Sequence, residues 1–154
     1  RILNINARSI LNKNDSIEAT LLEYDPHITV LTETWLRNGI SDDLVFPPSY
    51  SVFRKDRTSK GGGVAILIKP SIQAIVLADV IELECLCIKI TCWDHCFVLY
   101  ACYRPSDAAP EYLLKLQEHM IQLENKKLFL IGDFSLPNVD WELVQASRKS
   151  KKKC

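Results

Sequence analysis

One stretch near the C-terminal end, residues 128–137, constrains the fold of this chain more than any other. Four apolar residues at 128–131 predict a short strand that is buried on both faces. Gly132 then interrupts the apolar run, and Asp133 is an isolated carboxylate beyond it. Open α/β sheets place their chemistry just past the carboxyl ends of such strands, although an aspartate here also fits a simple turn. The role of Asp133 therefore depends on what the other predicted strand ends carry.

The remaining sequence predicts a strand-rich α/β domain with one helix near each end. Apolar or partly alternating runs predict strands at 2–6, 28–32, 50–53, 64–68, 72–78, 83–92, 97–103 and 128–131. Helical periodicity predicts helices at about 15–24 and about 110–124, and Asp15 and Glu18 have the spacing of a capping box. The turn-like segment 93–95 predicts an antiparallel hairpin between the strands on either side. We therefore expect a mixed sheet flanked by helices.

The charges divide the chain into a body and a tail. The 154 residues have a formal net charge of zero, but residues 148–154 hold five of the 19 basic side chains and no acidic one. The body, residues 1–147, keeps 14 basic against 19 acidic side chains, a balance of −5, and so lacks the basic character of many nucleic-acid binders. We expect one domain at 1–147 and a basic tail at 148–154, either solvated or in contact with nucleic acid.

The apolar runs and the cysteines point to an intracellular protein, nuclear or cytoplasmic, without a membrane partner. No apolar run approaches the ~20 residues that a membrane span needs, and no secretory signal is visible. Five of the six cysteines lie in strand-like sequence without the spacing of a zinc site. We expect them to be reduced thiols that act as small apolar residues.

Polar groups stand at the ends of four predicted strands: Asn6, Glu33, Tyr103 and Asp133. On one sheet with matching ends, these side chains would converge on one rim. Glu33 is a hard oxygen ligand suited to Mg²⁺, and Asp133 can orient or deprotonate a water for attack on a phosphate. Asn6 can position either the ligands of the metal or Asp133. The Tyr103 hydroxyl can donate a hydrogen bond to a phosphate oxygen. Together these residues predict a phosphodiester-cleaving site.

Three arginines are candidates for binding substrate, because a guanidinium can contact a phosphate with two hydrogen bonds. They are Arg54, Arg57 and Arg104. Structural roles stay open beside the functional ones. Glu33 also suits the start of a helix, Tyr103 suits a core position with a solvent-exposed hydroxyl, and Arg54 and Arg57 suit ordinary surface positions. The common placement of the polar groups at strand ends favours the functional interpretation.

Five segments occur in the order found in a known family: 6–9, 31–36, 54–57 with 61–66, 102–105, and 132–137 with 140–141. Together they resemble the endonuclease domain of non-LTR retrotransposons, of the chicken-repeat or jockey-like kind. That domain belongs to the endonuclease/exonuclease/phosphatase superfamily. The resemblance covers residues 2–141 and implies a four-layered α/β sandwich, C-terminally truncated, with 1–147 as its N-terminal part.

The resemblance also implies a role for each candidate residue. Asn6 matches the first active-site asparagine, with Asn4 as its competitor, and Glu33 matches the metal-binding glutamate. Tyr103 matches the tyrosine that contacts the scissile phosphate, and Asp133 matches the aspartate that orients the attacking water. The implied cofactor is Mg²⁺ or Mn²⁺, and the implied substrate is DNA. The family nicks DNA so that a reverse transcriptase in the same polyprotein can prime on the freed end.

Two departures from the family pattern bear on activity. The family has asparagine where this chain has Ser135, and losing one preorganised donor of this kind typically lowers a rate ~100–1000-fold. The family's later half also carries a further aspartate and a Ser-Asp-His motif, and the chain ends at Cys154 without them. We therefore expect an inactive fragment of a Mg²⁺-dependent DNA endonuclease. The alternatives are a non-catalytic nucleic-acid-binding remnant and a phosphodiesterase of the same superfamily acting on a lipid or inositol phosphate.

Overall fold

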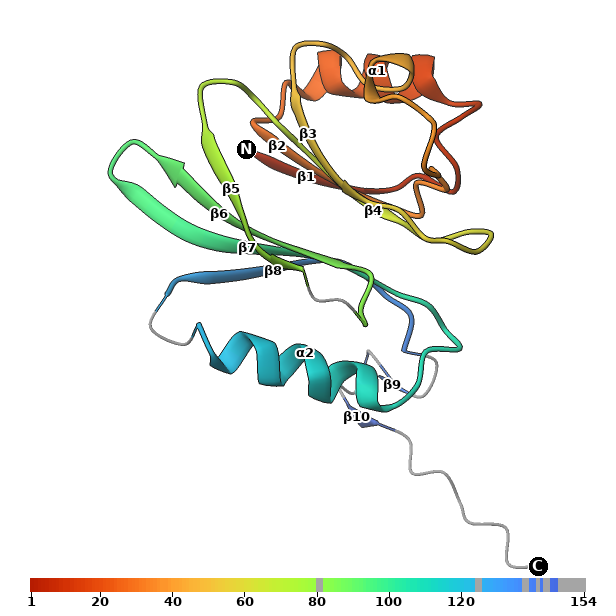
Figure 1. Cartoon of the computed structure of the whole chain (residues 1–154), viewed down its shortest axis with the longest axis vertical. Helices are drawn as coiled ribbons and strands as arrows, with labels where there is room; N and C mark the ends of the chain where they lie inside the picture. The colour runs from red at the N-terminus through yellow and green to blue at the C-terminus, as the bar shows by residue number, and fades with distance from the viewer. Residues whose placement is uncertain (80–81, 124–125, 137–138, 141, 143–144, 147–154) are drawn as a thin grey trace, which may run out of the picture.

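Two facing β-sheets, with one helix on the outside of each, form the body of the protein (Figure 1). The structure, a computed structural model, describes residues 1–79, 82–123, 126–136, 139–140, 142 and 145–146. The helices are α1 (Asn14–Tyr24), the short 3-10 turn η1 (Asp42–Leu44) and α2 (Glu111–Ile121). The strands are β1 (Ile2–Asn6), β2 (Ile28–Thr32), β3 (Ser51–Lys55), β4 (Val64–Ile68), β5 (Gln73–Asp79), β6 (Cys85–Cys92), β7 (His95–Arg104), β8 (Leu128–Phe134), β9 (Val139–Asp140) and β10 (Gln145–Ala146).

The strands pair within two four-stranded sheets and one short two-stranded ladder. The first sheet has the order β1-β2-β4-β3, the second has the order β5-β6-β7-β8, and β9 pairs with β10. Within the four-stranded sheets, β1 with β2 and β7 with β8 are parallel, and the other pairs are antiparallel. The expectation of a single mixed sheet is therefore wrong. The layers run α1, first sheet, second sheet, α2, which is the four-layered sandwich implied by the resemblance (Figure 1).

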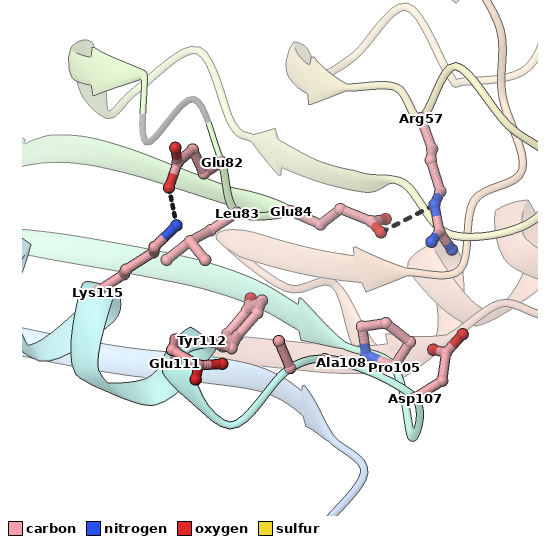
Figure 2. Close-up of a pocket in the computed structure, with 11 residues that line it drawn as sticks. Arg57, Glu82, Leu83, Glu84, Pro105, Asp107, Ala108, Glu111, Tyr112 and Lys115 are labelled. Carbon is pink, nitrogen blue, oxygen red and sulfur yellow. Dashed lines mark hydrogen bonds and ion pairs between the residues drawn. The ribbon is translucent and has the colours of Figure 1, made fainter.

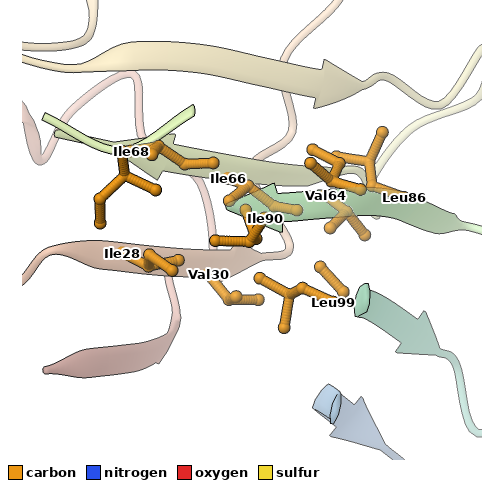
Figure 3. Close-up of a cluster of buried hydrophobic side chains, with 11 residues drawn as sticks. Ile28, Val30, Val64, Ile66, Ile68, Leu86, Ile90 and Leu99 are labelled. Atoms are coloured by element: carbon orange, nitrogen blue, oxygen red, sulfur yellow. The ribbon is translucent and has the colours of Figure 1, made fainter. Parts of the chain in front are cut away.

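The main core lies between the two sheets, where apolar side chains from facing strands meet (Figure 3). Alternate residues of β2 and β4 supply one side of this core, and alternate residues of β6 and β7 supply the other. The buried strand residues are Ile28, Val30, Val64, Ile66, Ile68, Leu86, Ile88, Ile90, Leu99 and Ala101. Burial of these side chains fixes the two sheets against each other and so fixes their strand ends.

The outer faces of the sheets are covered by the helices. Helix α1 packs Ile17 and Leu21 against Leu31 and Leu67 of the first sheet, and α2 packs its own apolar face against the second sheet. Strands β2 and β4 are buried along their whole length, because the first sheet has a helix on one side and another sheet on the other. This double burial accounts for the apolar sequence of β4, and it also buries Thr29 and Thr32 of β2.

The start of α1 differs from the sequence-based expectation. The helix begins at Asn14, its N-cap is Lys13, and no side chain caps it. Asp15 therefore lies inside the first turn rather than at the cap, and the predicted capping box is wrong. A carboxylate in the first turn still interacts favourably with the helix dipole. No helix among the described residues is long and apolar enough to cross a membrane.

Strand β8 is longer and more exposed than the sequence predicted. It continues to Phe134, so Gly132 and Asp133 lie within the strand rather than beyond it. Phe129 is 47% exposed and Leu130 is 43% exposed, because β8 stands at the end of the second sheet as described. The prediction that residues 128–131 are buried on both faces is therefore wrong. The predicted basic tail, 148–154, lies outside the described residues.

Gly132 allows β8 to approach β7 more closely than any other residue type would. Its φ is +153°, and a Cβ atom built on it would overlap the backbone carbonyl of Cys102. Gly132 is paired with Cys102 in the parallel ladder, and the next pair is Tyr103 with Asp133. The glycine that interrupts the apolar run thus marks a close approach of two strands. That approach places Asp133 beside Tyr103.

Candidate active site

Four predicted site residues meet where β1, β2, β7 and β8 end. The Asn6 side-chain amide donates one hydrogen bond to Glu33 Oε1, at 2.9 Å, and another to Asp133 Oδ2, at 2.6 Å. The Tyr103 hydroxyl lies close enough to Glu33 for this carboxylate to raise its pKa. These residues come from two facing sheets and not from one rim of a single sheet, which corrects the expected layout. The asparagine amide therefore bridges two carboxylates, with a phenol near one of them.

Parallel pairing within each sheet explains why these residues meet. Asn6 is the last residue of β1 and is paired with Thr32, so Glu33 follows directly beside it. Tyr103 and Asp133 are paired between β7 and β8. Strands β1 and β8 then contact each other across the sandwich, because the inter-sheet core sets the distance between them.

Asn4 and Asn6 share one face of β1 but have different partners. The Asn4 side-chain amide donates to the backbone carbonyl of Gly132, at 3.2 Å, and so joins β1 to β8. The Asn6 amide reaches the two carboxylates, and its carbonyl oxygen accepts the backbone N–H of Arg8, at 3.1 Å. Of the two candidates, Asn6 is the one that stands between the carboxylates.

The backbone around Glu33 is held in an unusual conformation. Arg8, Ser9, Glu33 and Trp35 all have positive φ, between 43° and 77°, which costs non-glycine residues of order 1–3 kcal/mol each. Backbone hydrogen bonds compensate, because Ser9 donates to the carbonyl of Glu33 and Trp35 donates to that of Gly62, both at 2.9 Å. The loops after β1 and β2 and the glycine-rich loop are thus tied together around Glu33.

Glu84 lies beside the Asn6 cluster, which is formed by Asn6, Glu33, Tyr103 and Asp133. Sequence reasoning missed this glutamate. It accepts the backbone N–H of Gly63, at 2.7 Å, and pairs with Arg57, at 3.2 Å. Its own backbone carbonyl accepts the N–H of Tyr103, at 2.8 Å. The sequence signal was weak, since Glu84 is one acidic residue at the start of an apolar run. Its proximity to Tyr103 comes from long-range pairing.

The surroundings of Tyr103 keep its hydroxyl protonated. Burial is the largest cause that raises the pKa of Tyr103, to about 12, followed by the charge of Glu33 and the hydrogen bond with it. The charges of Glu84 and Asp133 raise this pKa further. At neutral pH the phenol therefore retains its proton and can donate a hydrogen bond.

Arg54 and Arg57, predicted to bind substrate, are engaged with carboxylates. Arg54 pairs with Asp42, at 2.6 Å, and with Asp56, at 2.9 Å. Arg57 pairs with Glu84. The structure therefore places Arg57 close to the cluster through Glu84, whereas Arg54 lies in a separate ion-pair network with Asp42 and Asp56. Phosphate contacts by either arginine stay predictions.

Arg104 and Ser135 are joined to each other at the carboxyl ends of β7 and β8. Arg104 is 7% exposed, and its guanidinium donates to the backbone carbonyls of Pro105, Ala108 and Ser135. The Ser135 backbone N–H donates to the carbonyl of Arg104, at 3.0 Å. In the described fold Arg104 thus fixes the backbone of residue 135, and its predicted phosphate contact stays a prediction.

Glu33 is the residue best placed to hold a divalent cation. Its carboxylate and that of Asp133 lie on either side of the Asn6 amide. Mg²⁺ commonly takes one or two carboxylates and completes its shell with water and substrate oxygens. Among the described residues, no group of three or more His, Cys, Asp or Glu forms a self-sufficient metal cluster. The oxygen donors present therefore fit Mg²⁺ or Mn²⁺ that also binds a phosphate.

A cavity of about 280 Å³ lies next to the cluster, between α2 and the segment that precedes β6 (Figure 2). Glu84 and Arg57 lie at one end of it, and the Glu82–Lys115 ion pair lies at the other (Figure 2). Its lining does not include the bridging residue Asn6, which is exposed. The Asn6 side chain is therefore open to a large substrate rather than enclosed in this cavity.

Comparison with solved structures shows where this fold occurs. The chain is similar to the endonuclease domain of TRAS1, a telomere-specific non-LTR retrotransposon, with a TM-score of 0.68 and 14% identity over 92% of this chain and 61% of that chain. It is similar to the 3′ phosphatase NExo from Neisseria bound to a product DNA hairpin, with a TM-score of 0.60 and 18% identity over 90% and 58%. It is also similar to an AP endonuclease from Archaeoglobus fulgidus, with a TM-score of 0.55 and 18% identity over 90% and 56%.

The structural matches establish the fold of the chain, and the sequence comparison establishes its family. The chain spans about three fifths of the length of these three structures, and the low identities establish a shared fold. No curated protein sequence matches the chain significantly. The family model described as the endonuclease/exonuclease/phosphatase family matches residues 3–152. The chain therefore belongs to the endonuclease/exonuclease/phosphatase family.

Proposed function

We propose that this chain carries the N-terminal part of a Mg²⁺- or Mn²⁺-dependent site that cleaves phosphodiester bonds in DNA. The observation that carries the proposal is the Asn6 amide bridging Glu33 and Asp133, with Tyr103 near Glu33. The likeness to the TRAS1 endonuclease domain supports a retrotransposon origin, and the ordered motifs favour the chicken-repeat or jockey-like group. The proposed partner is a reverse transcriptase in the same polyprotein. The proposed place of action is the nucleus or the cytoplasm.

In this proposal Asn6 organises the two carboxylates. The Asn6 amide donates to both carboxylates, and so holds them in fixed positions beside each other. Asp133 can then orient the attacking water and accept its proton. A Mg²⁺ ion bound at Glu33 would neutralise charge on a phosphate oxygen and on the leaving alkoxide.

Tyr103 supplies a hydrogen bond that strengthens as the reaction proceeds. Its pKa of about 12 keeps the hydroxyl protonated at neutral pH, whereas a phenolate would repel the phosphate. The hydroxyl can donate to a non-bridging oxygen as negative charge builds there. A polymeric substrate suits the exposed position of Asn6 better than a small inositol phosphate, which would be enclosed more fully in a cavity.

We further propose that this activity is very low in the chain, because Ser135 replaces the asparagine of the family pattern. The test is nicking of supercoiled plasmid DNA in the presence of Mg²⁺. We expect the wild-type chain to nick the plasmid at a rate close to background. The Glu33→Gln variant should nick at the background rate. Rapid nicking that Glu33→Gln abolishes would contradict the low activity. Nicking that survives both Glu33→Gln and Asp133→Asn would contradict the site itself.

A further inference from the structure

A second cavity, also of about 280 Å³, shares no lining residue with the acidic cavity of Figure 2. Residues of three loops line it, among them Ser9, Trp35, Arg37, Lys60 and Gly61. The three loops are the one after β1, the one after β2 and the glycine-rich loop before β4. Glu33 lies in the loop after β2, two residues before Trp35, so the second cavity lies next to a residue of the candidate active site in the chain.

Trp35 is the aromatic residue of this cavity, and its backbone is fixed. It follows Glu33 by two residues and has a φ of +57°. Its N–H donates to the carbonyl of Gly62, and its indole nitrogen would lie 3.9 Å from a Cβ atom on Gly61. Even so, Trp35 is 36% exposed. A strained but anchored backbone thus holds a partly exposed indole beside the catalytic cluster.

The charges near the site favour this side for a polyanion. Arg37 and Lys60 are exposed, and within the described part of the chain no ion pair engages either of them. Arg8, next to Asn6 in the following loop, is also exposed. These cations can therefore contact phosphates without first breaking an ion pair.

The cavity on the α2 side has the opposite character. Four of its lining residues are acidic, namely Glu82, Glu84, Asp107 and Glu111. Its two cations, Arg57 and Lys115, are paired with two of these acids. The remaining negative charge repels phosphates. A nucleic-acid strand that reaches the Asn6 cluster is therefore directed over the Trp35 side.

We propose that Trp35 stacks on a base next to the cleaved phosphate, while Arg37 and Lys60 contact the flanking phosphates. This inference rests on the proposed function and narrows its substrate to DNA that is single-stranded or locally unpaired at the site. An indole face stacks on any base, and stacking on an exposed aromatic is sequence-tolerant. Removing one such aromatic typically weakens binding about 5- to 150-fold.

Fluorescence anisotropy with two labelled oligonucleotides tests this stacking. One is a short oligothymidylate, and the other has the same length but abasic units in place of the thymidines. EDTA in the buffer prevents cleavage. We expect Trp35→Ala to weaken oligothymidylate binding by about 5- to 150-fold and to leave abasic binding unchanged. Trp35→Phe, which keeps an aromatic face, should bind nearly as well as the wild type.

Trp93→Ala is the matched control, because Trp93 is 89% exposed at the turn between β6 and β7. Equal oligothymidylate binding by the wild type and Trp35→Ala would overturn the stacking while leaving the proposed function standing. Equal losses with both oligonucleotides, or a loss in Trp35→Phe as large as in Trp35→Ala, would also overturn it. Failure of the wild type to bind either oligonucleotide would contradict the proposed function as well.

Discussion

Replacing Ser135 with asparagine is expected to raise the rate of plasmid nicking by about 100- to 1000-fold. Residue 135 follows Asp133 by two positions, and its backbone N–H still bonds to the carbonyl of Arg104 beyond the end of β8. Side chains two residues apart in extended backbone lie on the same face, so residue 135 is on the face of Asp133. An asparagine there regains a carboxamide donor that the serine hydroxyl is too short to replace.

Measuring initial nicking rates of the wild type and Ser135→Asn on supercoiled plasmid with Mg²⁺ tests this expectation. Ser135→Ala is the matched control and should behave like the wild type, because the hydroxyl is not expected to contribute. The gain must disappear in the double variant Ser135→Asn with Glu33→Gln. A rate ratio near one, or a gain that persists without Glu33, would show that position 135 does not act through this site.

Replacing Gly132 with alanine is expected to destabilise the protein by about 3 kcal/mol or more. The new Cβ atom would overlap the backbone carbonyl of Cys102, and the φ of +153° disfavours a side chain. A backbone carbonyl within a parallel ladder cannot move aside as a flexible side chain can. Relief therefore requires β8 to shift away from β7, which also separates Asp133 from Tyr103.

Urea unfolding followed by circular dichroism measures this loss. Gly39→Ala is the matched control, because Gly39 also has a positive φ, +99°, but nothing lies within 4 Å of its Cβ position. Only backbone strain remains there, of order 1 kcal/mol. Similar free energies of unfolding for the two variants would show that the close approach of β8 to β7 is not what Gly132 provides.

The sequence predicted the parts of this fold that depend on local pattern. Predominantly apolar runs identified β2 and β4, because strands buried on both faces carry few polar residues. Asn6 and Glu33 could be found because each is a polar residue at the end of a predicted strand or directly after it. The order of five motifs then indicated the endonuclease/exonuclease/phosphatase superfamily, which the family model confirms.

Features that depend on contacts between distant segments could not be predicted in this way. Nothing local distinguishes one mixed sheet from two facing sheets, since both need the same apolar strands. The exposure of Phe129 and Leu130 depends on which strands lie beside β8. Glu84 reaches Gly63 and Arg57 through the packing of one sheet on the other. The partners of Arg104 are backbone carbonyls, which leave no signal in the side-chain pattern.

Binding of Mn²⁺ to the metal-free chain tests the bridged carboxylate site most directly, because it requires neither DNA nor cleavage. Free Mn²⁺ can be followed by electron paramagnetic resonance during a titration of the wild type, Glu33→Gln and Glu82→Gln. Glu82 is the control, since it is an exposed glutamate paired with Lys115 away from Asn6. We predict one Mn²⁺ site that Glu33→Gln weakens by about tenfold or more and Glu82→Gln leaves unchanged. Equal affinities in the wild type and Glu33→Gln, or no Mn²⁺ binding by the wild type, would contradict a metal site at Glu33.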